Sequence, residues 1–298
     1  MKEFTLKASS DNLDLAVALF EPEGSPKGFI QFVHGMCEHK ERYFATMEWL
    51  AGNGYACIIH DNRGHGASVK SPEDLGYMYE GGWSAMVDDA KIVTDWSKAN
   101  FPGLRYTLFG HSMGSLIVRS YAKRYDDAID QLFVCGCPSD NPLKGVGKLL
   151  AGSIGAVRGD HYRSDMLQGM TLGSYNKKFE KQPNAWVCSD KECRAKYNED
   201  PLCQFIFTAN GFQNLMGLMQ DCYSLKGWKM ANPGLPVHFI SGAEDPCRLS
   251  DKALQQAVDK MKKVGYANTD LKTYPGMRHE ILNETEKHIV REDLLKYL

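Results

Sequence analysis

The chain has 298 residues, of which 43% are hydrophobic and 24% are charged, with a formal net charge of −2. These values are close to the average of soluble globular proteins, which excludes collagen-like, coiled-coil and intrinsically disordered chains. Basic residues are spread along the chain without runs, so binding to a nucleic-acid backbone has no electrostatic basis.

Membrane-spanning and secreted proteins are also disfavoured. No uninterrupted apolar stretch approaches the roughly 20 residues that cross a bilayer, and residues 1–13 are charged and alternating where a signal peptide is apolar. The nine cysteines are an odd number without a CxxC pair, and we interpret them as reduced thiols. We therefore expect a cytoplasmic protein.

The first half of the chain alternates short apolar runs with helical patterns. Residues 3–7 and 13–20 are typical of a hairpin, and further strands are expected at 29–33, 55–60, 106–109 and 131–135. Helices are expected at 43–51, 83–99 and 115–125. This order predicts an α/β fold with a mostly parallel central sheet and helices on both faces.

The rhythm stops after residue 138 and resumes with strands at 237–240 and 270–274 and helices at 250–264 and 283–298. The stretch between has apolar residues on helical spacing, among them Phe212, Leu215, Met216 and Met219. We therefore predict a core of residues 1–140 and 234–298, with a helical cap inserted at 141–233.

Residues 110–114, Gly-His-Ser-Met-Gly, fit the pattern G-x-S-x-G between an apolar strand and a helix. A bare match also describes a glycine-rich turn, but this context favours a serine nucleophile at Ser112. The glycines are needed because side chains at 110 and 114 would collide with neighbouring backbone in a sharp, strained turn. The turn also puts Ser112 at the N-terminal end of the helix, where developing negative charge is favoured.

A serine hydroxyl needs an imidazole to accept its proton and an acid to orient that imidazole. His279 follows the last expected strand, whereas His288 lies within the final helix and His111 is expected to point away from the serine. For the acid we choose Asp245, which follows the strand at 237–240. Asp140, after the strand at 131–135, is the alternative.

An oxyanion formed at the serine needs two N–H donors. The amide of Met113 is expected to be the first, and the loop after the strand at 29–33 is expected to supply the second from Met36. In the same loop, His34, Glu38 and His39 resemble a metal cluster, but we interpret them as residues that shape the loop.

Five segments together carry a family resemblance: residues 34–39 (HGMCEH), 61–68 (DNRGHGAS), 110–114 (GHSMG), 242–246 (GAEDP) and 278–284 (RHEILNE). They resemble the α/β-hydrolase group of monoacylglycerol lipases and bacterial lysophospholipases, also described as serine aminopeptidase-like. One departure is Ser115, which stands where many relatives have a third glycine.

The resemblance implies the α/β-hydrolase fold and a triad of Ser112, Asp245 and His279 with the amides of Met36 and Met113. It also implies cleavage of an ester through an acyl-enzyme on Ser112, with neither a metal nor an organic cofactor.

The substrate has several candidates. Our leading hypothesis is a small-molecule ester, a monoacylglycerol, lysophospholipid or other medium-to-long acyl ester, with the four apolar cap residues named above lining an acyl pocket. That apolar face is also what would hold a cap helix in place. The alternatives are a short-chain or aromatic carboxylesterase, a serine aminopeptidase, or a binding protein that has lost turnover. A peptidase needs an acidic group for the substrate amine, and the cap offers Asp160, Asp165, Glu180 and Asp221.

The sequence does not fix the oligomeric state. It also does not fix whether the cap makes a transient contact with a membrane surface.

Overall fold

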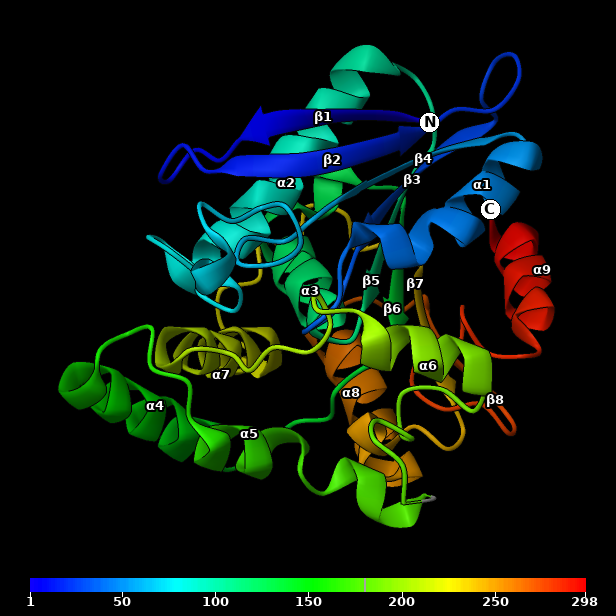
Figure 1. The fold of residues 1–298 in the computed structure, drawn as a ribbon. Helices are drawn as coiled ribbons and strands as arrows, with labels where there is room; N and C mark the ends of the chain where they lie inside the picture. Colours follow the sequence, from blue (N-terminus) through cyan, green and yellow to red (C-terminus); the bar gives the residue numbers. More distant parts are fainter. Residues whose placement is uncertain (180) are drawn as a thin grey trace.

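A sheet of eight strands organises the chain in the computed structural model, which describes residues 1–179 and 181–298 (Figure 1). The strand order is β1-β2-β4-β3-β5-β6-β7-β8. The first two strands form an antiparallel hairpin, β2 pairs antiparallel with β4, and the other neighbours pair in parallel. The bounds are β1 (Lys2–Lys7), β2 (Asp14–Phe20), β3 (Gly28–Val33), β4 (Tyr55–His60), β5 (Tyr106–His111), β6 (Gln131–Cys135), β7 (Val237–Gly242) and β8 (Thr269–Tyr274).

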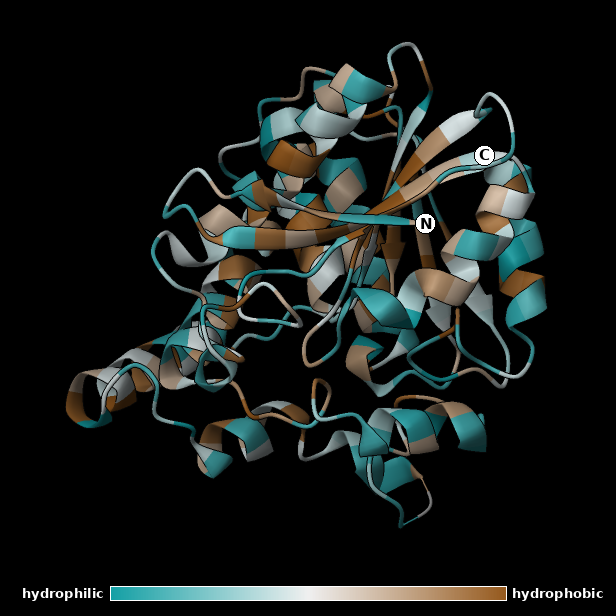
Figure 2. Cartoon of the chain, turned by 45° about the horizontal axis from the view of Figure 1, so that its top comes forward, coloured by the Kyte–Doolittle hydropathy of each residue, from teal (hydrophilic) through white to brown (hydrophobic). Residues whose placement is uncertain are grey.

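Helices cover both faces of this sheet because its strands are apolar on both sides. In β4, for example, Ile58 belongs to one buried cluster and Ile59 to the other. The first cluster includes side chains of α2 (Gly82–Asn100), α3 (Met113–Tyr125) and α8 (Asp251–Val264), and the second those of α1 (Phe44–Gly52) and α9 (Lys287–Tyr297). Figure 2 shows hydrophobic residues along the central strands. The predicted α/β fold is confirmed.

Four further helices lie between β6 and β7 in the sequence: α4 (Lys144–Arg158), α5 (Asp165–Leu172), α6 (Lys191–Glu199) and α7 (Ala209–Tyr223). They lie beyond the carboxyl ends of β5 and β6 (Figure 1), and α7 packs against both α3 and α4. We call residues 141–233 the cap segment below; the division of the chain into a core and a cap stays a prediction. None of the helices in the described ranges combines the length and apolarity that a bilayer crossing requires.

Most expected elements occur within a few residues of their predicted bounds, but the last helix begins later than expected. Residues 283–286 form turns, and α9 starts at Lys287. The cause is Glu284, whose carboxylate accepts hydrogen bonds from the amides of Ser189 and Arg278 at 2.9 and 2.8 Å. Contacts with other segments thus keep residues 283–286 in turns, although their local pattern is typical of a helix.

The structure also has short 3₁₀ helices at Lys40–Tyr43, Pro72–Asp74, Asp126–Ala128, Tyr175–Lys178 and Pro246–Arg248.

Candidate active site

Ser112 occupies a strained turn between β5 and α3. Its φ of 54° and ψ of −119° are rare for a residue with a side chain, and its amide donates to the carbonyl of Cys135 on β6 at 2.9 Å. A Cβ at Gly110 would collide with the carbonyl of Gly114, and one at Gly114 with that of Val33. The two glycines are therefore required by the close approach of backbone around the serine, as the sequence analysis expected.

The serine stands where the direction of strand addition reverses. From β3 the chain moves to β4 on one side and then to β5 on the other, and sites in α/β sheets form at such a switch point, beyond the carboxyl ends of the strands. Met36, in the loop after β3, and Met113, the first residue of α3, line the same cavity as Ser112. The first amides of a helix have no partner within it, which suits the Met113 N–H to the expected oxyanion role.

His279 and Asp245 form a buried pair at the ends of β8 and β7. Nδ1 of His279 lies 2.9 Å from Oδ2 of Asp245, and Oδ1 of Asp245 accepts from the amide of Cys247 at 2.8 Å. Burial opposes ionisation of this carboxyl, but the charge and hydrogen bond of His279 outweigh it and hold the pKa of Asp245 below its ordinary value. The aspartate is therefore an anion suited to orienting the imidazole.

The alternative acid, Asp140, is engaged by two lysines. Asp140 pairs with Lys144 and Lys260, with N–O distances of 2.5 and 3.1 Å. The contact of Asp245 with Nδ1 of His279 therefore favours Asp245 over Asp140 as the partner of His279.

Ser112 and His279 line one cavity. Over residues 1–179 and 181–298, however, no hydrogen bond joins the two side chains, and Nε2 of His279 lies 3.9 Å from Sγ of Cys247 instead. Such bonds often tighten only when substrate is bound. Cys247 was missed by the sequence analysis; its place two residues after Asp245 was the one available signal.

His111, which was expected to point away from the serine, belongs to the site through other residues. It is buried, lines the cavity, and hydrogen-bonds through Nδ1 to Oε1 of Glu38 at 3.0 Å and through Nε2 to the carbonyl oxygen of His279 at 3.2 Å. Because both partners are acceptors, both ring nitrogens carry a proton. Burial lowers the pKa of His111, but the charge of Glu38 outweighs it and raises this pKa above its ordinary value. No sequence signal pointed to this pair.

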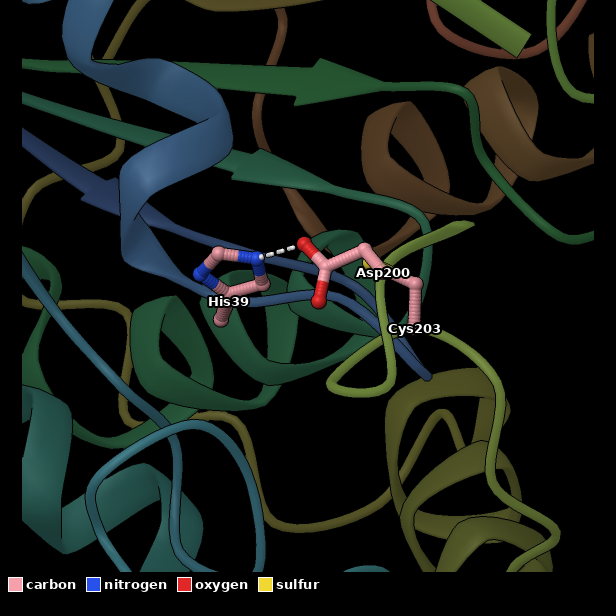
Figure 3. A group of neighbouring side chains, drawn as sticks. All are labelled: His39, Asp200 and Cys203. Atoms are coloured by element: carbon pink, nitrogen blue, oxygen red, sulfur yellow. Dashed lines mark hydrogen bonds and ion pairs between the residues drawn. The ribbon is translucent and has the colours of Figure 1, made fainter. Parts of the chain in front are cut away.

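Glu38 shapes the loop after β3, as expected. Its carboxylate also accepts from the amide of Gly35 and from the hydroxyl of Tyr43. In the same loop, Nε2 of His39 lies 2.7 Å from Oδ2 of Asp200 in the cap segment (Figure 3). These contacts fix the loop that carries Met36.

A cavity of about 220 Å³ opens beside Ser112. The four residues predicted for an acyl pocket all line it: Phe212, Leu215, Met216 and Met219. Several other lining residues were not predicted from the sequence. They come from α3, α4, α5 and the segments before α4 and α6, among them Leu116, Leu143, Val146, Leu167, Met170 and Trp186.

Two groups of side chains in the described residues have donor types and spacing that could hold a metal ion: His39 with Asp200 and Cys203, and Asp245 with Cys247 and His279. In each group the ligand atoms lie within 4.8 Å of one another. The expectation that the enzyme needs no metal stays a prediction.

Comparison with known proteins decides the family. The family model described as "Serine aminopeptidase, S33" matches residues 24–286. The chain belongs to this family. It is therefore a hydrolase of the α/β-hydrolase fold, and the predicted resemblance is confirmed.

Individual relatives agree with this membership over nearly the full length. The chain is 26% identical to a monoacylglycerol lipase of Mycolicibacterium smegmatis over 281 residues, 94% of this chain and 91% of the relative. It is 32% identical to a monoglyceride lipase homolog of Monkeypox virus, over 96% of this chain and 93% of the relative. Among solved structures, a carboxyl esterase from Bacillus coagulans superposes with a TM-score of 0.91 at 23% identity, covering 99% of this chain and 97% of the esterase.

Proposed function

We propose that the protein is a serine hydrolase that cleaves monoacylglycerols, lysophospholipids or related medium-to-long acyl esters. One observation carries the proposal: Ser112, on its strained turn, opens into a largely apolar cavity that it shares with His279, whose Nδ1 contacts Asp245. The relatives named monoacylglycerol lipase and monoglyceride lipase homolog support the choice of substrate.

In the proposed reaction, Nε2 of His279 takes the proton of Ser112 as its oxygen attacks the ester carbonyl. Asp245 stabilises the imidazolium that results, and the amides of Met36 and Met113 donate to the oxyanion. His279 then returns the proton to the leaving alcohol, and an acyl-enzyme remains on Ser112. Water, activated by the same imidazole, releases the carboxylic acid.

The cavity lining favours an acyl chain over a charged amine. Apolar pockets gain about 0.8 kcal/mol for each methylene that they bury, and most of the lining side chains are apolar. The two acidic residues of the lining are engaged, Glu38 by His111 and Glu280 by Arg42. Asp160, Asp165 and Asp221 are not part of the lining, and Glu180 lies outside the described residues. A serine aminopeptidase is therefore the less supported alternative.

A fluorophosphonate probe tests the serine mechanism. The wild-type protein should be labelled and Ser112→Ala should not. An unlabelled wild-type protein would instead favour a binding protein that has lost turnover.

A chain-length series tests the substrate. Rates are measured on p-nitrophenyl esters from acetyl to long acyl groups, on 1-monoacylglycerols and on aminoacyl amides. The rates on the esters should rise with acyl length, and the rates on the amides should be low. A preference for acetyl over octanoyl esters would contradict the lipid substrate and favour a short-chain carboxylesterase.

The proposal also includes a cytoplasmic location, which nine free cysteines support. It further includes a transient contact of the cap segment with a membrane surface.

A further inference from the structure

A thiol stands beside the imidazole that the proposed reaction uses. Sγ of Cys247 lies 3.9 Å from Nε2 of His279. Both side chains are buried and both line the cavity next to Ser112. Asp245 holds the opposite ring nitrogen, Nδ1, at 2.9 Å. Thiolate, imidazole and carboxylate are the ligands that zinc prefers in proteins, so the site has the chemistry of a zinc site as well as that of a hydrolase.

We infer that a thiophilic divalent cation of the zinc class binds between Nε2 of His279 and Sγ of Cys247 and inhibits the enzyme; this rests on the proposed function. Zinc bonds to histidine nitrogen at about 2.0 Å and to cysteine sulfur at about 2.3 Å. One ion therefore spans the 3.9 Å between these atoms with little movement.

The aspartate fits this arrangement without leaving its place. Histidines that bind zinc usually donate their other ring N–H to a carboxylate, which fixes the ring orientation. Asp245 already accepts from Nδ1 of His279. The cation would thus use the free nitrogen of an imidazole that the carboxylate has already oriented.

Charge and proton balance decide how tightly the ion binds. The Asp245 carboxylate attracts a cation, whereas the protonated ring of His111, with its centroid 4.6 Å from that of His279, repels it. Burial and the charge of Asp245 raise the pKa of the Cys247 thiol. This raised pKa opposes binding, because the cation must displace the thiol proton, which leaves to solvent as the sulfur–metal bond forms.

Inhibition follows from the loss of the base. A nitrogen that is bonded to a cation has no lone pair to accept the proton of Ser112. The inhibition is therefore reversible when a chelator removes the ion.

The second candidate group provides a matched control. His39, Asp200 and Cys203 also lie within metal-binding distance of one another (Figure 3). There, however, the positive charge of Arg42 acts on both Asp200 and Cys203, which disfavours a second cation. Cys203 is a buried thiol like Cys247, so substituting it isolates the effect of position.

The experiment uses the full chain and compares wild type, Cys247→Ser, Cys247→Ala and Cys203→Ser. Ester hydrolysis is titrated with ZnCl₂, each variant relative to its own metal-free rate, and EDTA is then added. In a separate titration with CdCl₂, the ultraviolet charge-transfer absorption of a cadmium–thiolate bond is recorded. This measurement does not depend on ester hydrolysis. We expect wild type and Cys203→Ser to be inhibited reversibly. Both Cys247 variants should need a zinc concentration about tenfold or more higher for half inhibition, and both should lose the cadmium band. The reason is that losing a direct ligand lowers metal affinity at least as much as losing a hydrogen-bond partner of a ligand.

Equal inhibition and equal cadmium absorption in wild type and the Cys247 variants would overturn the inference, as would a wild-type protein with no cadmium–thiolate band. If the Cys247 variants do not fold, zinc must protect Cys247 of the wild type from iodoacetamide, as located by peptide mass mapping. Absence of protection also overturns the inference. If no ester is hydrolysed, the proposed function fails alone, because the cadmium titration still decides whether the site binds metal.

Discussion

Nδ1 of His111 lies 3.0 Å from Oε1 of Glu38, and this pair joins the loop after β3 to the loop after β5. The same imidazole donates to the carbonyl oxygen of His279. One buried ion pair thus connects the loop of the expected oxyanion donor, the serine turn and the histidine loop.

Replacing Glu38 by Gln should therefore weaken both stability and rate. The change leaves the buried His111 without its counter-ion, and a hydrogen bond to a charged group contributes about 1.5–3 kcal/mol. We expect the free energy of unfolding in urea to fall by that amount and kcat to fall more than KM rises, since loop geometry is disturbed. Glu41→Gln, at an exposed position in the neighbouring turn, is the control and should leave both quantities unchanged. If Glu38→Gln had the free energy of unfolding and the kcat of wild type, the pair of Glu38 and His111 would not be positioning these loops.

The same pair predicts a pH dependence of stability. The pKa of His111 is raised above its ordinary value of 6.5, so its contribution is complete below pH 6.5 and is lost as pH rises through its raised pKa. The pKa of Glu38 is lowered from its ordinary value of 4.5, with burial opposed by the charge and hydrogen bond of His111. That contribution is present above pH 4.5 and is lost as pH falls. Wild type should thus lose stability relative to Glu38→Gln as pH increases above 6.5, measured by urea unfolding across pH 5–9. A parallel pair of curves would contradict the assignment.

Asp245→Asn should abolish most of the activity while the protein stays folded. The amide cannot stabilise the imidazolium and favours the wrong tautomer of His279, which in a comparable triad costs about 10⁴-fold in kcat. Asp140→Asn is the matched control, because Asp140 pairs with Lys144 and Lys260 and should keep the wild-type rate. If Asp140→Asn were the inactive variant, the assignment of the acid would be wrong.

Activity should rise with pH, because only a neutral imidazole accepts the proton of serine. Initial rates of wild type between pH 5 and 8 measure this. A flat profile would argue against His279 as the base.

The sequence was most informative where the chain's chemistry is local. The turn at Ser112 requires glycines that stand two residues to either side, and Asp245 and His279 each follow a predicted strand, so topology alone brought their loops to one edge of the sheet. Contacts between distant segments left no such signal. Glu38 and His111 are 73 residues apart, and His39 and Asp200 are 161 apart, and nothing in their local patterns pairs them. The late start of α9 has the same origin, because Glu284 is held by residues that no periodicity links to it.

Filling the cavity from an exposed position should shift the preferred acyl length. Met170 on α5 is 62% exposed yet lines the cavity, whereas Met166, one turn earlier, is 52% exposed and does not. Met170→Trp should therefore lower kcat/KM for long-chain esters, by about fourfold for each methylene excluded at 0.8 kcal/mol, and spare acetyl esters. Met166→Trp should leave the chain-length profile as in wild type. Identical profiles for the two variants would mean that the acyl chain does not pass Met170.

The close approach of backbone at the serine turn is open to a direct test by paired glycine substitutions. Gly114→Ala puts a methyl group against the carbonyls of Val33 and His34, and because backbone cannot yield as a flexible side chain does, overpacking should cost about 1–3 kcal/mol or more. Gly169→Ala, inside α5, meets open space and should raise the free energy of unfolding by about 0.5–1 kcal/mol, since alanine loses less backbone entropy in a helix. Urea unfolding and fluorophosphonate labelling of both variants measure the difference. A Gly114→Ala protein as stable and as readily labelled as Gly169→Ala would show that the turn does not depend on this contact.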